Sequence, residues 1–105
     1  MAHNEIDLAR PKENSKQIGF LPIERSWVDR VIESGFIDTF RASFPDKVMY
    51  SWWDQKTRSR ERNVGWRIDY IFVSKSLKDM YTSATILDDF LGSDHAPVVV
   101  ECEIK

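Results

Sequence analysis

The sequence predicts a mixed α/β (α+β) domain with a mainly antiparallel sheet and helices on one face. Three observations favour this fold class: one stretch with helical periodicity, four stretches rich in β-branched and aromatic residues, and polar connections between them. The chain of 105 residues is long enough for one domain with a modest core.

Two helical segments are expected after residues 1–20, whose polarity and lack of clear periodicity predict mostly loop. Pro22, at a favoured first-turn position, opens a helix over residues 22–34, and Gly35 ends it. Asp38 is expected to cap a short helical turn over residues 39–43. The apolar stripe of the long helix is expected to comprise Ile23, Trp27 and Val31, with Ile32 and Val28 as further members.

Four strands are expected, over residues 49–53, 66–73, 80–87 and 97–104. The first two would form a hairpin with a long basic loop, residues 56–64. Both sides of the 66–73 strand are apolar, which is typical of a strand that is covered on two faces. A second layer is therefore expected to cover this strand, and 105 residues contain little to supply it.

Composition excludes some classes of protein. No stretch approaches the roughly 20 apolar residues of a membrane span, and the N-terminus has no signal-peptide pattern. The single cysteine, Cys102, excludes an internal disulfide framework and fits a reducing compartment; we expect it to fill a small site in the core. A cytoplasmic protein that is not secreted and binds no membrane is therefore expected.

The charge is unevenly distributed. The net charge is −2, yet residues 56–67 carry five basic side chains against Glu61, a local charge of +4 that leaves −6 for the rest. In an extended segment, alternate basic residues would share a side. A solvated face is the simpler reading, whereas a directed contact with an anion explains the excess of positive charge. The basic residues are Lys56, Arg58, Arg60, Arg62 and Arg67.

An acid within an apolar strand is the most informative chemical signal. Asp69 is costly to bury there unless it has a partner, and the best partner is His95, in the run Gly92-Ser93-Asp94-His95-Ala96-Pro97. A carboxylate behind an imidazole fixes the ring, which suits contact with a phosphate oxygen. Asp94 would orient a water molecule or join a metal site. A capped turn with a surface histidine is the simpler alternative.

Three tryptophans lie near these residues in the sequence. Trp52, Trp53 and Trp66 are most simply core aromatics. Trp66, however, directly follows the basic loop, and indoles beside guanidinium groups are typical of a nucleic-acid surface.

Together these residues resemble the exonuclease III family of apurinic/apyrimidinic endonucleases, in the wider endonuclease/exonuclease/phosphatase superfamily. The run Ser-Asp-His-Xaa-Pro is typical of the whole superfamily. The runs Glu-Ile-Asp-Leu and Asn-Val-Gly-Trp-Arg-Ile-Asp-Tyr resemble its DNA-repair branch more specifically. The matching runs are Ala2-His3-Asn4-Glu5-Ile6-Asp7-Leu8, Pro11-Lys12, Gly19-Phe20, Asp38-Thr39-Phe40, Tyr50-Ser51-Trp52-Trp53, Asn63-Val64-Gly65-Trp66-Arg67-Ile68-Asp69-Tyr70 and Gly92-Ser93-Asp94-His95-Ala96-Pro97.

The resemblance implies Mg²⁺- (or Mn²⁺-) dependent cleavage of double-stranded DNA on the 5′ side of an abasic site, 3′–5′ exonuclease activity, or both. His95 would contact the scissile phosphate, Asp69 would hold His95, and Asp94 would serve the metal. The abasic sugar would enter a pocket lined by Trp52, Trp66 and Ile68. The DNA backbone would lie against Asn63, Lys56, Arg58, Arg60, Arg62, Arg67, Lys12 and Asn14. A DNA-repair enzyme of this kind is expected near the nucleoid of a prokaryote.

The resemblance also implies a missing partner. In the family a Gly-Asp-Xaa-Asn motif stands at or just before the position of Ala2, and further active-site residues lie ahead of it. Residues 1–105 are therefore expected to be the C-terminal half of a four-layer α/β sandwich, inactive alone and able to self-associate through its uncovered sheet face. The alternatives are a DNA-binding module without catalysis and a half-domain of another phosphoesterase.

Overall fold

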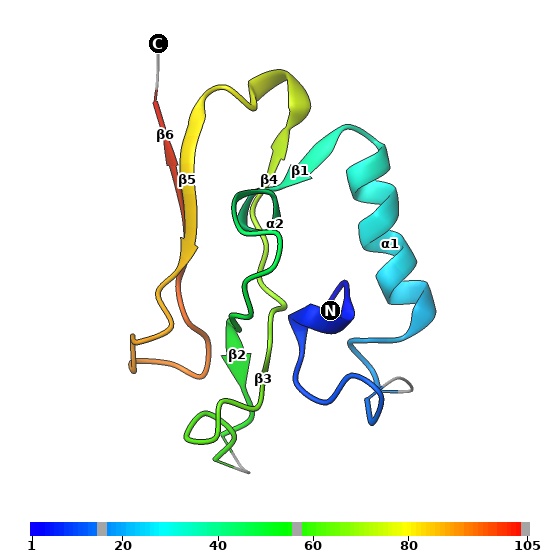
Figure 1. Ribbon diagram of the computed structural model, residues 1–105, viewed down its shortest axis with the longest axis vertical. Helices are drawn as coiled ribbons and strands as arrows, with labels where there is room; N and C mark the ends of the chain where they lie inside the picture. The colour runs from blue at the N-terminus through cyan, green and yellow to red at the C-terminus, as the bar shows by residue number, and fades with distance from the viewer. Residues whose placement is uncertain (15–16, 56–57, 104–105) are drawn as a thin grey trace.

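The computed structural model describes residues 1–14, 17–55 and 58–103 as a flattened body of 45 × 31 × 20 Å. The long helix and the β5–β6 ribbon lie on opposite sides of it, with β1, β4 and α2 between them (Figure 1). The elements in chain order are η1 (Glu5–Asp7), α1 (Pro22–Glu33), β1 (Phe36–Asp38), α2 (Thr39–Ser43), β2 (Trp52–Trp53), β3 (Gly65–Trp66), β4 (Phe72–Ser74), η2 (Lys75–Leu77), β5 (Tyr81–Ile86) and β6 (Val98–Cys102).

The long helix begins at Pro22 as expected. The carboxylate of Glu24 accepts hydrogen bonds from the backbone N–H groups of Gly19 and Leu21, which satisfies two donors just ahead of the helix. The predicted apolar stripe is only partly right: Ile23 is 76% and Trp27 53% exposed, whereas Val28, one of its further members, is buried. The helix packs on β1 through a face rotated by about one residue from the expected one.

The short helix α2 has the predicted cap. The Asp38 carboxylate accepts a hydrogen bond from the backbone N–H of Arg41 (3.3 Å). Asp38 also ends β1, a strand that was not predicted. This strand pairs antiparallel with β4, with Ile37 opposite Val73.

The expected hairpin exists between β2 and β3, which pair Trp52 with Trp66. The predicted strand 66–73 is not continuous, because Trp66 belongs to this hairpin and Phe72 to the ladder with β1. The basic loop is not extended either: residues 58–63 form tight turns closed by a bond from Val64 N–H to the Ser59 carbonyl (2.9 Å). Its cations therefore do not line up along one side.

The last two strands form the longest ladder, with Ala84 opposite Val100 and Ile86 opposite Val98. Ala84 and Ile86 pack with Phe40, Tyr50 and Trp53 in the larger of two buried clusters. Cys102 is exposed at the end of β6, so the expected core role for it is wrong. Within the described residues the strands form three separate antiparallel ladders. The predicted mixed α/β fold with antiparallel pairing is therefore confirmed, but the strands do not join into the one continuous sheet that was expected.

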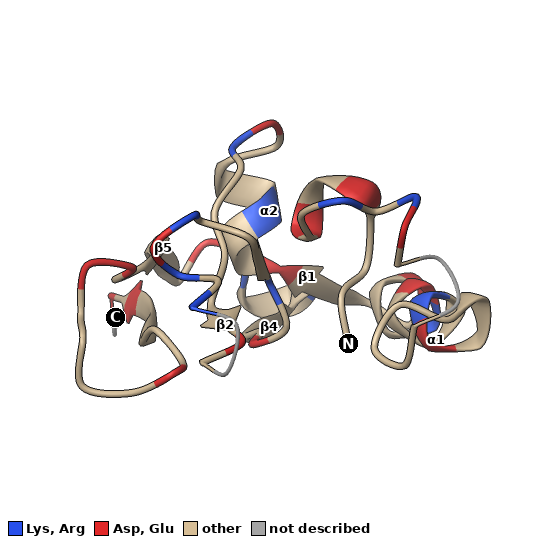
Figure 2. Cartoon of the chain, turned by 90° about the horizontal axis from the view of Figure 1, so that it is seen from below, with Lys and Arg blue, Asp and Glu red and all other residues tan. Residues whose placement is uncertain are grey.

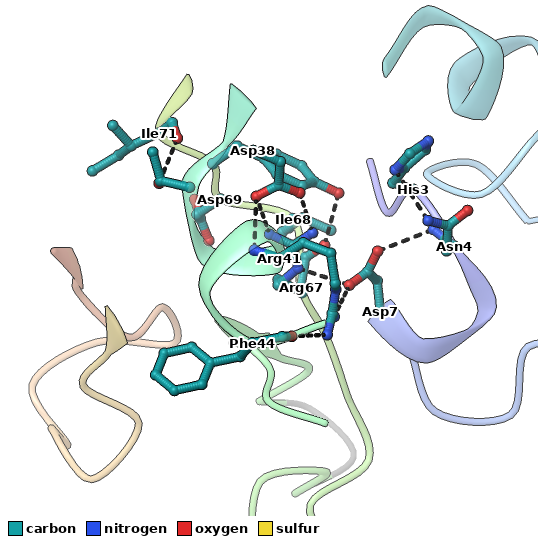
Figure 3. A network of polar contacts seen from close by, with 12 residues as sticks. His3, Asn4, Asp7, Asp38, Arg41, Phe44, Arg67, Ile68, Asp69 and Ile71 are labelled. Carbon is teal, nitrogen blue, oxygen red and sulfur yellow. Dashed lines mark hydrogen bonds and ion pairs between the residues drawn. The ribbon is translucent and has the colours of Figure 1, made fainter. Parts of the chain in front are cut away.

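A buried ionic network joins the middle of the molecule (Figure 3). The guanidinium of Arg67, 1% exposed, donates to both carboxylate oxygens of Asp38 (3.0 and 2.5 Å) and to Asp7 (2.7 Å). Arg41 adds a second ion pair to Asp7 and donates to the carbonyl groups of Phe44 and Lys47. Arg67 is therefore a core residue, and the predicted DNA contact of its side chain is wrong.

Burial and charge oppose each other at Asp7. Burial alone would raise the pKa of this carboxyl, but hydrogen bonds from Arg67 and Arg41, the Arg67 charge and the backbone N–H of Asn4 together lower it. The pKa of Arg67 is raised, because its two carboxylate partners outweigh its own burial. Both groups are charged at neutral pH, so the network tethers η1 and β1 to residue 67.

The apolar residues of 66–73 do not form a fully open face. Ile71 is 36% exposed, while Ile68, Tyr70, Phe72 and Val73 are half-buried. Self-association through this region stays a prediction. No helix among the described residues has the length and apolarity to cross a membrane.

Candidate functional site

The structure brings Asp69 and His95 together, as their sequence context predicted. The Asp69 carboxylate lies 2.8 Å from Nδ1 of His95. The carboxylate accepts, so Nδ1 carries the hydrogen of this bond and Nε2 is left for another partner. The two side chains are 39% and 44% exposed, so the pair lies at the surface rather than in the core.

Ser51 anchors both chain segments that carry this pair. Its side-chain oxygen accepts hydrogen bonds from the backbone N–H groups of Ile68 (3.1 Å) and Asp69 (3.2 Å). Its carbonyl accepts from the N–H of Ala96 (2.7 Å), the residue after His95. Ser51 is fully buried, so these bonds are shielded from water. One serine thus sets the separation between the aspartate and the histidine.

Asp94 is held by the neighbouring tryptophans. Trp52 donates its indole N–H to one carboxylate oxygen (3.2 Å), and Ser93 donates its hydroxyl to the other (3.3 Å). The Asp94 carbonyl accepts from the backbone N–H of Trp53 (3.2 Å). A bridge between Trp52 and His95 continues this pairing, so the loop before β6 lies alongside β2. The backbone of Asp94 and that of His95 are therefore both paired with β2, while the His95 ring is held by Asp69.

A metal ion is the expected companion of Asp94. Among the described residues, no group of three or more His, Cys, Asp or Glu side chains is placed to hold one. Mg²⁺ requires a nearly octahedral set of oxygen ligands, of which Asp94 offers one residue. The described part of the chain therefore does not by itself make a complete site for such an ion.

A pocket of about 480 Å³ shares Trp52 and Ile68 with the surroundings of Asp94, His95 and Asp69. It is lined by Trp52, Trp66 and Ile68, the three residues predicted to accept an abasic sugar, and by Asn14. Trp52 links the pocket to Asp94 through its indole N–H, and Ile68 adjoins Asp69 in the chain. The remaining lining is mostly polar, including Arg10, Glu13, Gln17 and Asp54.

Local packing fixes Trp66 in this pocket. Its ring meets Phe20 edge to face (centroids 6.5 Å apart). Gly19 has a φ of +102°, and a Cβ atom there would lie 3.1 Å from the Trp66 ring. The glycine therefore supplies both the left-handed turn and the room for the indole.

The basic residues predicted to contact DNA differ in exposure and in hydrogen bonding, although several basic positions lie beside β2 (Figure 2). Arg58, Arg62 and Lys12 are exposed to solvent, where a polyanion would reach them. Asn63, also exposed, accepts a hydrogen bond from the Trp53 indole (3.1 Å). Arg60 is half-buried and bound to the loop before Asp94. Lys56 lies outside the described residues.

Several residues of the site were not foreseen. No role is predicted for Ser51 from the sequence. A small hydroxyl residue inside an aromatic strand is nevertheless a signal for a buried side chain that hydrogen-bonds the backbone. The sequence predicts Asp38 only as a cap, and Asp7 lies in the first stretch, which is predicted to be mostly loop. Asp7 and Asp38 are also the partners of Arg67. The signal for this role is an arginine within an apolar strand, because a buried guanidinium needs carboxylate partners.

Comparison with known proteins identifies a family that the chain matches. Residues 1–95 match the model of the endonuclease/exonuclease/phosphatase family. An exodeoxyribonuclease of Bacillus subtilis is 50% identical over 99 residues, which cover 93% of this chain and 39% of the relative. The DNA repair nuclease APEX1 of Danio rerio is 41% identical over 101 residues, covering 95% of this chain and 33% of that protein. The chain thus spans between a third and two fifths of these relatives.

Solved structures agree with the fold. A 3′ phosphatase from Neisseria, bound to a product DNA hairpin, superposes with a TM-score of 0.92 at 28% identity over 99% of this chain and 42% of that one. An AP endonuclease from Leishmania major gives a TM-score of 0.91 at 30% identity, over the whole of this chain and 33% of that one.

Proposed function

Because the chain belongs to the endonuclease/exonuclease/phosphatase family, we propose that it supplies the histidine side of a DNA-repair phosphodiesterase site that cleaves DNA 5′ to abasic residues. One observation supports this most: Asp69 and His95 are hydrogen-bonded, and each adjoins a residue of a pocket of about 480 Å³, Asp69 following Ile68 in the chain and His95 forming a backbone bridge with Trp52. The proposal is supported by the names of similar proteins, among which are an exodeoxyribonuclease, a DNA repair nuclease, a 3′–5′ exonuclease and an AP endonuclease.

The proposed chemistry rests on the free nitrogen of His95. With Nδ1 bound to Asp69, Nε2 is the atom that can donate to a phosphate oxygen as negative charge develops on it. Asp69 keeps the ring in the required tautomer and orientation. The half-exposed position of both groups leaves room for a phosphodiester of the DNA backbone.

The pocket would provide the preference for abasic sites. A base-less sugar is compact and can enter between Trp52, Trp66 and Ile68, whereas a normal nucleotide would carry a base with it. Lys12, Arg58 and Arg62, which are exposed, would hold the backbone on either side. These contacts position the substrate and carry no chemistry.

The rest of the machinery would come from outside residues 1–105. The family is generally dependent on a divalent metal ion, Mg²⁺ or Mn²⁺ in our proposal, and Asp94 would be one of its ligands. Residues that complete the ligand set would belong to the rest of the family domain, which would also cover the half-buried apolar residues of 66–73. We define the completed protein as this chain joined to the remaining part of the Bacillus subtilis relative.

Replacement of Trp66 by alanine is expected to reduce the preference of the completed protein for abasic over intact duplex by about 1–3 kcal/mol, the discrimination that the shape of an apolar pocket usually provides. Arg58→Ala is expected to weaken binding to both duplexes equally and to reduce the salt slope by about one. Competition binding at several salt concentrations measures both.

Trp27→Ala is the matched control, because Trp27 is 53% exposed on α1 and does not line the pocket. It is expected to change neither binding nor preference. A uniform loss of affinity in Trp66→Ala, with preference intact, would reject the pocket. It would favour the second candidate, a DNA-binding module without catalysis.

A further inference from the structure

Arg60 stands out among the basic residues because its guanidinium is committed to one loop. Its two terminal nitrogens donate to the carbonyl groups of Asp88 (2.6 Å), Phe90 (2.6 Å) and Ser93 (3.2 Å). The planar guanidinium of an arginine holds its donors on separate nitrogens in a rigid fork, whereas the three donors of a lysine sit on one compact ammonium at the end of a flexible stem. The guanidinium carbon also lies 4.3 Å from the centre of the Trp53 ring.

The segment that carries Arg60 is firmly attached to the site. Val64 N–H donates to the Ser59 carbonyl and Ser59 N–H to the Asp54 carbonyl, which closes the turn onto the end of β2. Trp53, under the Arg60 guanidinium, is 3% exposed and donates its indole N–H to Asn63. Arg60 is therefore fixed relative to the strand that positions Asp69 and Asp94.

The loop that Arg60 holds has little other support. Between β5 and Asp94, Phe90 is 52% and Leu91 81% exposed, so apolar burial contributes little there. Phe90 N–H donates to the Leu87 carbonyl (3.1 Å), a contact within the loop itself. Asp94 and His95 follow directly, so Arg60 adds to the bonds from Trp52, Trp53 and Ser51 that hold this segment beside Asp69.

We infer that Arg60 is a positioning residue: it clamps residues 88–93 to the β2–β3 turn and so keeps Asp94 and His95 in register with Asp69. This rests on the proposed function for its effect on catalysis, but the clamp itself is a property of the chain. Arg60 is then not one of the phosphate contacts, although it lies in the basic segment.

Arg60→Lys is the informative variant, because it keeps the charge and the contact with Trp53 while losing the fork. In the 105-residue chain, amide hydrogen exchange of Trp53, which donates to the Asp94 carbonyl, and of Ala96, which donates to Ser51, is expected to speed up by about tenfold or more. Exchange in the β5–β6 ladder should stay unchanged. Arg58→Lys is the matched control, since Arg58 is exposed in the same turn, and should alter neither set.

In the completed protein, Arg60→Lys is expected to lower kcat by about 10- to 100-fold with KM within about twofold, as for a misplaced catalytic group. The salt slope of DNA binding should not change. Unchanged exchange at Trp53 and Ala96 would overturn the clamp, and a salt slope reduced by about one, as for a phosphate contact, would do the same. The exchange experiment needs no activity, so it tests the clamp even if the completed protein cleaves no DNA.

Discussion

Replacement of His95 by alanine is expected to lower kcat of the completed protein on an abasic duplex by about 10²–10³-fold, with little change in KM. His95 is proposed to donate Nε2–H to charge that develops in the transition state, so its loss should affect turnover rather than binding. Asp69→Asn should act in the same direction, because the amide no longer holds the ring through a charged acceptor. Steady-state kinetics with a synthetic abasic duplex measures both variants.

The chain contains a matched control for this experiment. His3 also pairs with an aspartate, Asp29, at 2.5 Å, but it does not line the aromatic pocket. His3→Ala is expected to leave kcat and KM close to the parent values. A His95→Ala variant in which KM rises while kcat is retained would contradict the role given to His95, since that pattern marks uniform binding.

Replacement of Arg67 by methionine is expected to lower the free energy of unfolding by about 3–5 kcal/mol, a large part of the roughly 5–15 kcal/mol of an ordinary domain. Arg67 is 1% exposed and pairs with Asp7 and Asp38, which are buried as well. Methionine fills much of the volume but leaves two carboxylates in the interior without their partner. Urea unfolding followed by circular dichroism measures the loss.

The exposed Arg58 is the control for charge removal, and Arg58→Met is expected to change the stability by less than about 0.5 kcal/mol. Equal stability of the Arg67 and Arg58 variants would show that the network does not hold the fold.

The pH dependence of the free energy of unfolding gives a second test of the network. The pKa of Asp7 is lower in the folded chain than its ordinary value of 3.8, so its contribution is complete above that value and is lost as the pH falls through the lowered pKa. The stability gap between the parent and Asp7→Asn should therefore narrow below pH 3.8.

Elements with strong local signals were predictable. Pro22 and Gly35 bracket the long helix, and Asp38 caps the short one, because cap chemistry depends on a few adjacent residues. The strand β1 was missed, since three residues directly after a glycine carry no periodicity. The strand expected over 66–73 is divided because Arg67 turns to a buried carboxylate pair and Asp69 to His95, and no local pattern reveals those partners.

The candidate site was predictable where the chemistry demanded a partner. A lone acid in an apolar strand required a counterpart, and His95 was the best one in the chain; the hydrogen bond between them confirms the pairing. The cations were harder, because a count of charges cannot tell an exposed arginine from a buried one. Arg67 is in the core and Arg60 is bound to three carbonyl groups, while Arg58 and Arg62 are exposed.

Cleavage of a duplex with one abasic residue is the most direct measurement on the proposed site. The substrate carries a label on the damaged strand, and the completed protein is compared with its His95→Ala variant, with folding of both verified by circular dichroism. We expect a metal-dependent cut on the 5′ side of the abasic residue from the parent and a rate lower by about 10²–10³-fold from the variant. A folded parent that binds the abasic duplex yet cuts it no faster than His95→Ala would contradict the assignment of a catalytic site to Asp69 and His95.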